Sequence, residues 1–155
     1  MRDDVGSSEE SSDDYTIDMM NHLNIEYVGP LFIGTPMQGN KDSKFYYDTG
    51  TGTTLTTATG CDSGCASHYY NPLKSSTSQA VVNGTDTTVK TLKTGNIKGD
   101  WYKDKVCINE KLCVDDWGVF AGTAPSKPIE FDGVLGFSFI NDTAGIHNTS
   151  FVQAL

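Results

Sequence analysis

The chain has 155 residues, with 20 acidic residues against 11 Lys and Arg, and a formal net charge of −9. This length suits one domain, or one lobe of a larger protein. The negative charge argues against a nucleic-acid partner, because such a partner requires a basic patch on the protein.

Residues 1–15 form an acidic, Ser-rich segment that we expect to be disordered. A secretory signal peptide would place an apolar stretch here, and "MRDDVGSSEESSDD" contains none. No later run reaches the length of a membrane span. We therefore expect that an upstream portion of the protein is missing or processed.

From Ile25 onward, short apolar runs alternate with turns, and the 16 glycines with many Thr and Ser favour an all-β fold. In chain order the strand-like runs include "IEYVGPLFIG", "SKFYYDTG", "DKVCI", "KLCVDDWGVFAG" and "FDGVLGF". Two hairpins are expected, one around "VVNGTDTTV" with Asn83-Gly84 as its turn, and one in "LKTGNIKGDWY" with glycines near its tip. The final "SFVQAL" indicates the beginning of a short helix.

The four cysteines fall into two local pairs, Cys61 with Cys65 and Cys107 with Cys113. An even count at short spacing favours two small disulfide loops, although four cysteines allow three connectivities. Zinc is the alternative, but its usual knuckles use Cys-x-x-Cys spacing, which neither pair has. Three glycosylation sequons, at Asn83, Asn141 and Asn148, also fit a secretory route. We expect a secreted or lysosomal/vacuolar protein.

The stretch "KFYYDTGTGTTLTT" leads three aromatic residues, Phe45, Tyr46 and Tyr47, directly into Asp48. A buried carboxylate is costly unless it is paired or hydrogen-bonded. The sequence must therefore satisfy Asp48 with hydrogen bonds or use it in chemistry.

Asp48-Thr49-Gly50 resembles the active-site turn of pepsin-like aspartic proteases. Four other stretches resemble the amino-terminal lobe of that family, in the family's order: "NHLNIEYVGPLFIGTPMQ", "CDSGCASHYYNPLKSSTS", "TGNIKGDWYKDKV" and "FDGVLGFSF". The resemblance implies that residues 20–155 form this lobe, with twisted antiparallel sheets and a β-hairpin flap.

The resemblance also implies roles for the turn. Asp48 would be one of two aspartates that share a proton across a water molecule, and Gly50 would allow close backbone approach. The Thr49 hydroxyl would lock the turn against its partner, and Thr51 would replace the serine that hydrogen-bonds the carboxylate. No metal or organic cofactor is implied, and the substrate would be an extended polypeptide.

The chain supplies a single catalytic aspartate in this interpretation. Asp62-Ser63-Gly64 spells the same signature, but it lies between two cysteines and no apolar strand leads into it; a polar turn is the better interpretation. We expect the second aspartate to come from a carboxy-terminal lobe outside these 155 residues. The isolated chain is then expected to be inactive and to self-associate through an exposed apolar face.

The expected flap comprises Leu92, Lys93, Thr94 and Gly95. The family usually has tyrosine and glycine where this chain has Leu92 and Lys93, and a tryptophan near the position of Leu55. A leucine flap still closes over an apolar side chain but lacks a polar tip. The substitutions affect substrate preference and full activity more directly than the acid–base chemistry.

Two other hypotheses remain open. A single-lobed protease could pair two copies of Asp48 in a homodimer, or the chain could be a non-catalytic relative that binds peptides. His22, His68 and His147 are scattered and are interpreted as surface or core residues. Asp132 in "FDGVLG" is interpreted as structural.

Overall fold

The computed structural model describes residues 16–81, 88–91, 95–138 and 148–155. The acidic segment 1–15 therefore lies outside the described residues. The strands are β1 (Met20–His22), β2 (Glu26–Gly29), β3 (Phe32–Ile33), β4 (Phe45–Asp48), β5 (Thr54–Thr57), β6 (Gln79–Ala80), β7 (Thr88–Thr91), β8 (Gly95–Cys107), β9 (Cys113–Pro125) and β10 (Gly133–Gly136). A short 3-10 helix η2 (Pro72–Lys74) and helix α1 (Phe151–Ala154) complete the described elements.

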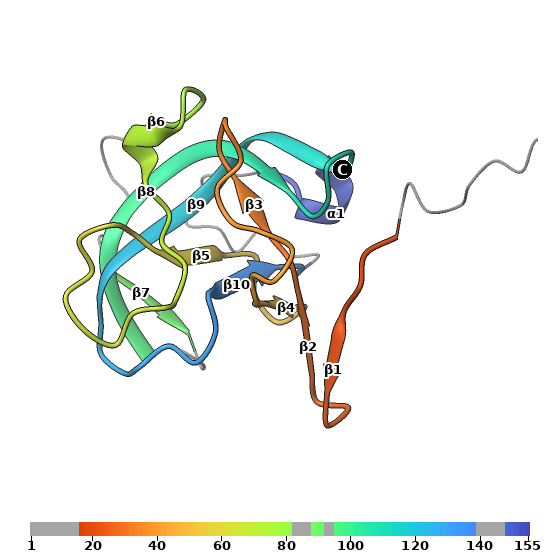
Figure 1. The fold of residues 1–155 in the computed structure, drawn as a ribbon, viewed down its shortest axis with the longest axis horizontal. Coiled ribbons are helices and arrows are strands. Elements are labelled where there is room, and N and C mark those ends of the chain that lie inside the picture. Colours follow the sequence, from red (N-terminus) through yellow and green to blue (C-terminus); the bar gives the residue numbers. More distant parts are fainter. Residues whose placement is uncertain (1–15, 82–87, 92–94, 139–147) are drawn as a thin grey trace, which may run out of the picture.

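These strands form one sheet in the order β1-β2-β4-β10-β5-β9-β8-β3, with β6 and β7 also paired to β8. The long strands β8 and β9 run side by side as a curved hairpin around the shorter central strands (Figure 1). The all-β prediction is confirmed. The sheet is mixed, however, because β4 pairs with β10, and β5 with β9, in parallel.

The two hairpin predictions have different outcomes. β7 and β8 pair antiparallel from Thr88↔Lys98 to Thr91↔Gly95, so a hairpin is present at the second site. Its first strand precedes Leu92, however, and Gly99 lies within the continuous strand β8 and not near a tip. The Asn83-Gly84 turn of the first lies outside the described residues. The flanking strands β6 and β7 each pair with β8.

Both predicted disulfides are present, Cys61–Cys65 and Cys107–Cys113. The predicted terminal helix is also confirmed as α1. The Ser150 hydroxyl oxygen accepts from the Gln153 backbone N–H, and the Gln153 side-chain oxygen accepts from the Ser150 backbone N–H. The buried Phe151 ring packs edge-on against Trp117, with centroids 5.1 Å apart, and so fixes the helix to the core.

Alternation along β4 divides its side chains between the two faces of the sheet. Phe45 and Tyr47 face the main core, which also contains Leu135, Val119 and Trp117. Tyr46 and Asp48 face the other way. We call that second side the Asp48 face.

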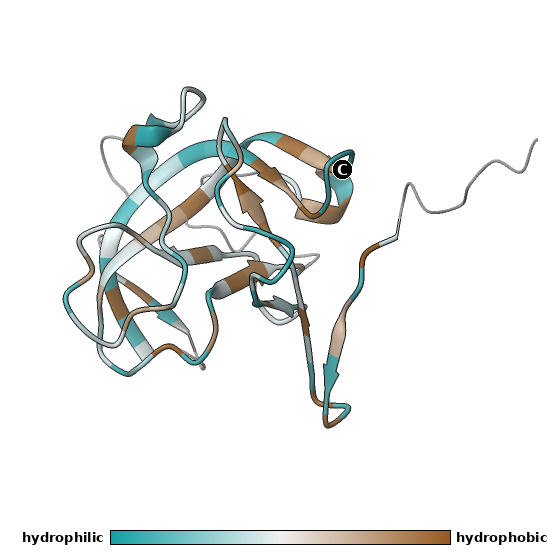
Figure 2. Cartoon of the chain, viewed as in Figure 1, coloured by the Kyte–Doolittle hydropathy of each residue, from teal (hydrophilic) through white to brown (hydrophobic). Residues whose placement is uncertain are grey.

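On the Asp48 face, cross-strand neighbours continue the apolar surface. Val28 and Val134 pair with Tyr46, Leu55 pairs with Val134, and Phe120 pairs with Leu55. In Figure 2 strongly apolar stretches accordingly lie on β9 and β10 in the middle of the sheet. Asp48 therefore stands at the end of an apolar surface.

Exposed apolar side chains gather on the β1–β2 hairpin, which extends away from the rest of the sheet (Figure 1). They are Met19, Met20, Leu23, Ile25 and Tyr27, between 39% and 78% exposed.

Candidate active site

Asp48 ends β4, and a tight turn that follows the strand holds its carboxylate. The Gly50 backbone N–H donates to Asp48 Oδ1 at 2.8 Å. A Cβ on Gly50 would lie 3.1 Å from the same oxygen, so glycine keeps this approach open. The turn thus offers a backbone donor to the Asp48 carboxylate.

The loop after β10 holds the same turn from the side. Phe137 N–H donates to the Asp48 carbonyl oxygen at 2.7 Å, and Ser138 N–H donates to the Thr51 carbonyl oxygen at 3.0 Å. Gly136 is paired with Asp48 in the register of β10 and β4. A residue 88 positions along the chain therefore fixes the backbone on which the carboxylate stands.

The structure gives a hydrogen-bond partner for one of the two expected hydroxyl groups of the turn, that of Thr51. The Thr51 side-chain oxygen accepts from the Thr53 backbone N–H at 3.1 Å, and its bond to the Asp48 carboxylate stays a prediction. Thr49 is exposed, so its contact with a partner lobe also stays a prediction.

Tyr47 anchors the strand that leads to Asp48. Its hydroxyl donates to the Pro30 carbonyl oxygen at 2.6 Å, and its ring lies 5.2 Å from the Phe137 ring. Burial raises the pKa of Tyr47 above its ordinary value, so the phenol stays protonated and remains a donor. Sequence reasoning placed Tyr47 on a buried strand but gave no partner for its hydroxyl.

The expected flap is described only in part. Leu92, Lys93 and Thr94 lie outside the described residues, whereas Gly95 begins β8 with a φ of 66°. Asn96 and Ser126 fasten the hairpin to the end of β9: Asn96 N–H donates to Ser126 Oγ at 2.9 Å, and Ser126 N–H returns to the Asn96 carbonyl at 2.7 Å. No pattern in the sequence indicated this contact between Asn96 and Ser126.

Leu55 stands where the family resemblance predicted a tryptophan. It is fully buried and packs with Ile97, Trp101 and Phe120. The Trp101 and Phe120 rings meet edge-on at 5.2 Å. Aromatic and aliphatic side chains therefore pack together at the β7–β8 hairpin, with Val89 of β7 against them.

Asp62 lies in a different loop from the Asp48 turn, at the other end of β5. β5 runs from Thr54, near the Asp48 turn, to Thr57, and the Cys61–Cys65 loop follows the far end of that strand. Asp62 is exposed there, and its backbone N–H donates to the Thr123 carbonyl at 3.3 Å. This position fits the interpretation of a polar turn.

Asp132 is buried and fully engaged in structural bonds. Its carboxylate accepts from Lys44 N–H at 2.7 Å, His68 N–H at 3.1 Å and His68 Nδ1 at 2.9 Å. These bonds fit a structural role for Asp132 and give His68 a partner that sequence reasoning missed.

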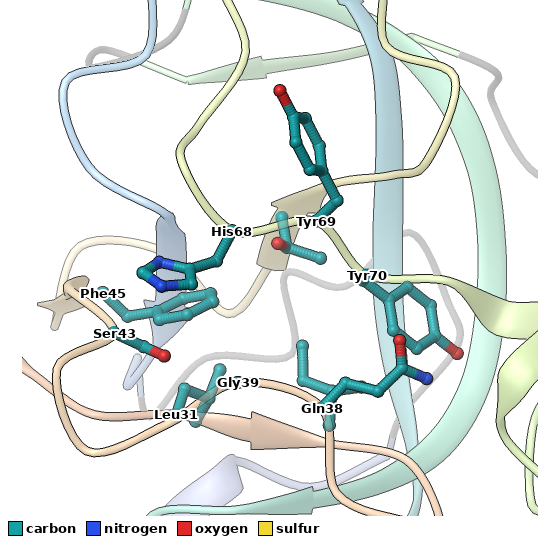
Figure 3. Close-up of a pocket in the computed structure, with 10 residues that line it drawn as sticks. Leu31, Gln38, Gly39, Ser43, Phe45, His68, Tyr69 and Tyr70 are labelled. Atoms are coloured by element: carbon teal, nitrogen blue, oxygen red, sulfur yellow. The ribbon is translucent and has the colours of Figure 1, made fainter.

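A small cavity lies beside His68 at the beginning of β4, while Asp48 lies at the end of that strand. Figure 3 shows His68, Phe45 and Ser43 on one side of it, with Gln38 and Tyr70 on the other. The cavity is therefore separate from the Asp48 turn.

Asp104 was also missed, because a single Asp in "WYKDKV" gives no hint of its surroundings. It is fully buried and accepts from the hydroxyls of Tyr70 at 2.7 Å, Ser75 at 3.0 Å and Thr77 at 2.6 Å. The network ties the loop around η2 to β8.

No three His, Cys, Asp or Glu side chains in the described part of the chain come together as a metal-binding set. Within the same residues, none of the helices is both long enough and apolar enough to span a bilayer.

Comparison with known proteins identifies relatives. The family model for eukaryotic aspartyl proteases matches residues 26–155. Pepsin II-2/3 from Oryctolagus cuniculus is 34% identical over 133 residues, which cover 80% of this chain and 32% of that protein. Renin from Ovis aries is 31% identical over 134 residues, which cover 82% of this chain and 32% of that protein.

Embryonic pepsinogen from Gallus gallus is 30% identical over 129 residues, which cover 78% of this chain and 31% of that protein. The chain thus spans about a third of the length of these relatives. The matched region contains the Asp48 turn, the β7–β8 hairpin and both disulfides. The chain belongs to the eukaryotic aspartyl protease family.

Proposed function

We propose that this chain is the amino-terminal lobe of an aspartic endopeptidase and that Asp48 supplies one carboxylate of its catalytic dyad. The observation that carries the proposal is the placement of Asp48. It ends a strand on an apolar sheet face, and its carboxylate accepts a backbone hydrogen bond from Gly50. The second aspartate comes from a carboxy-terminal lobe of the same protein.

In this mechanism two carboxylates about 3 Å apart share one proton, because both cannot ionise at that separation. The ionised carboxylate takes a proton from a water molecule, which attacks the peptide carbonyl. The protonated carboxylic acid donates to the carbonyl oxygen. The bonds from Gly50 and Phe137 keep Asp48 in place during both proton transfers.

The substrate in this proposal is an extended polypeptide, bound by strand-like backbone hydrogen bonds under the flap hairpin. Two disulfides support a protein that matures in an oxidising compartment, either secreted or lysosomal/vacuolar.

The direct test compares the complete gene product with residues 16–155 alone. Cleavage of a denatured protein is followed at acidic pH, and the mass of each sample is measured by sedimentation. We expect cleavage by the complete protein and none by the isolated lobe.

Two outcomes would favour the other hypotheses. Cleavage by the lobe alone, together with a dimer mass, would replace the two-lobed dyad with a homodimer. A complete protein that binds peptides without cleaving them would be a non-catalytic relative.

A further inference from the structure

The Asp48 face carries a second feature next to the carboxylate. Tyr46 precedes Asp48 by two residues on β4, so both side chains project from the same side of the sheet. Val28 on β2 and Val134 on β10 flank Tyr46 in register and pack with it. A substrate side chain that lies beside Asp48 toward the start of β4 therefore meets Tyr46.

The space above Val28 and Val134 is already occupied. The Tyr46 ring is 7% exposed and meets the Phe131 ring edge-on, with centroids 4.4 Å apart and an interplanar angle of 87°. Val28 and Val134 are 2% and 1% exposed. The Tyr46 and Phe131 rings therefore occupy the space over the two valines that a bulky apolar substrate side chain would otherwise fill.

The outer end of this aromatic pair is acidic. The Tyr46 hydroxyl donates to the Glu130 carboxylate, and burial together with Glu130 raises the pKa of Tyr46 to about 12. The phenol thus stays protonated at every pH at which the proposed chemistry operates. Glu130 is exposed and Phe131 is half-buried, so a carboxylate and an aromatic ring remain open to a ligand.

We propose that the substrate position beside Asp48 on the Tyr46 side selects a long basic side chain, Lys or Arg, through Phe131 and Glu130. This inference rests on the proposed endopeptidase function. The aliphatic stem of Lys or Arg lies along the Phe131 ring while the cationic head meets Glu130. An apolar side chain of equal length would cover the carboxylate without pairing it, which is unfavourable.

The exposure of Glu130 limits the size of the effect. Surface ion pairs and exposed cation–π contacts are individually weak, so their sum corresponds to roughly a 3- to 10-fold preference in cleavage rate. The preference is thus a bias among substrates and not an absolute requirement.

The test profiles cleavage of a peptide library by the complete protein, with mass spectrometry to locate each cleaved bond. We expect Lys or Arg to be enriched at one position within three residues of the bond. Glu130→Gln removes the charge with little change of shape and should abolish that enrichment. Glu110→Gln, an exposed glutamate in the turn between β8 and β9, is the matched control and should retain it.

Tyr46→Val provides a second arm, because it opens the space that the ring fills and should shift the preference toward larger apolar side chains. Cleavage without basic enrichment, or enrichment that survives Glu130→Gln, would overturn the inference while leaving the endopeptidase intact. If the complete protein shows no cleavage that requires Asp48, the proposed function itself would be overturned.

Discussion

Gly136 lies directly beside Asp48 in the parallel pairing of β10 with β4, and its missing side chain lets the Asp48 turn pass close by. A Cβ built on Gly136 would stand 2.4 Å from the Gly52 carbonyl carbon and 2.6 Å from Thr53 N. Both contacts are with backbone atoms, which have little room to move. The position of the carboxylate therefore depends on a glycine distant in sequence.

Gly136→Ala should displace the turn and destabilise the protein by about 1–3 kcal/mol, the usual range for forcing an extra methyl into a packed site. Urea unfolding measures the loss. Gly60→Ala is the comparison, because a Cβ there meets nothing within 4 Å. Alanine at Gly60 is therefore disfavoured only by the φ of 92°, and this variant measures backbone strain without a steric clash. An unchanged unfolding midpoint in Gly136→Ala would show that the turn is not held in this way.

Tyr47→Phe should lower the free energy of unfolding by about 1 kcal/mol, because it removes the hydrogen bond to the Pro30 carbonyl and keeps the ring. The matched control is Tyr27→Phe, since the Tyr27 side chain is 49% exposed on the β1–β2 hairpin. Equal stability of the two variants in urea unfolding would contradict the role assigned to the Tyr47 hydroxyl.

The same hydroxyl should make stability fall at alkaline pH. Burial raises the pKa of Tyr47 in the folded state above its ordinary value near 10. Above that pH the unfolded chain loses the phenolic proton while the folded chain keeps it. The Tyr47 contribution is thus complete below about pH 10 and declines above it, by up to about 1.4 kcal/mol per pH unit.

Tyr46 and Tyr70, whose pKa values burial also raises, contribute in the same direction. Unfolding free energies at pH 9, 10 and 11 should therefore fall less steeply for Tyr47→Phe than for the unaltered protein. Parallel curves for the two proteins would argue against a buried, protonated Tyr47.

Asp132→Ala should destabilise the protein by about 1–3 kcal/mol, because it removes the buried carboxylate that accepts from the Lys44 and His68 backbone N–H groups and from His68 Nδ1. Asp62→Ala removes an exposed carboxylate in the first disulfide loop and should change stability by less than about 0.5 kcal/mol. Thermal unfolding separates the two expectations. Similar melting temperatures would remove the structural role of Asp132.

The sequence predicted those parts of the fold that depend on neighbouring residues. The cysteine spacing indicated both disulfides, and the Gly-containing segment "LKTGNIKGDWY" indicated a hairpin, although its first strand, β7, precedes that segment. Asp48 at the end of an aromatic strand was likewise a local pattern.

The distant relationships were not predictable in the same way. Alternation along β4 shows which side chains share a face but does not identify β10 as a parallel neighbour. The partner of the Tyr47 hydroxyl is a backbone carbonyl, which no residue type reveals. Asp104 and its three hydroxyl donors come from separate segments, so their network appears only after the chain has folded.

The measurement that tests the central claim most directly is the acid-pH cleavage rate of the complete protein with Asp48→Asn, which preserves shape and removes the carboxylate. Asp62→Asn is the control, since it alters the Asp62-Ser63-Gly64 triplet, which lies away from the proposed site. The account predicts a loss of at least about 100-fold for Asp48→Asn and an unchanged rate for Asp62→Asn. Full cleavage by the Asp48→Asn protein would contradict the assignment of Asp48 to the catalytic dyad.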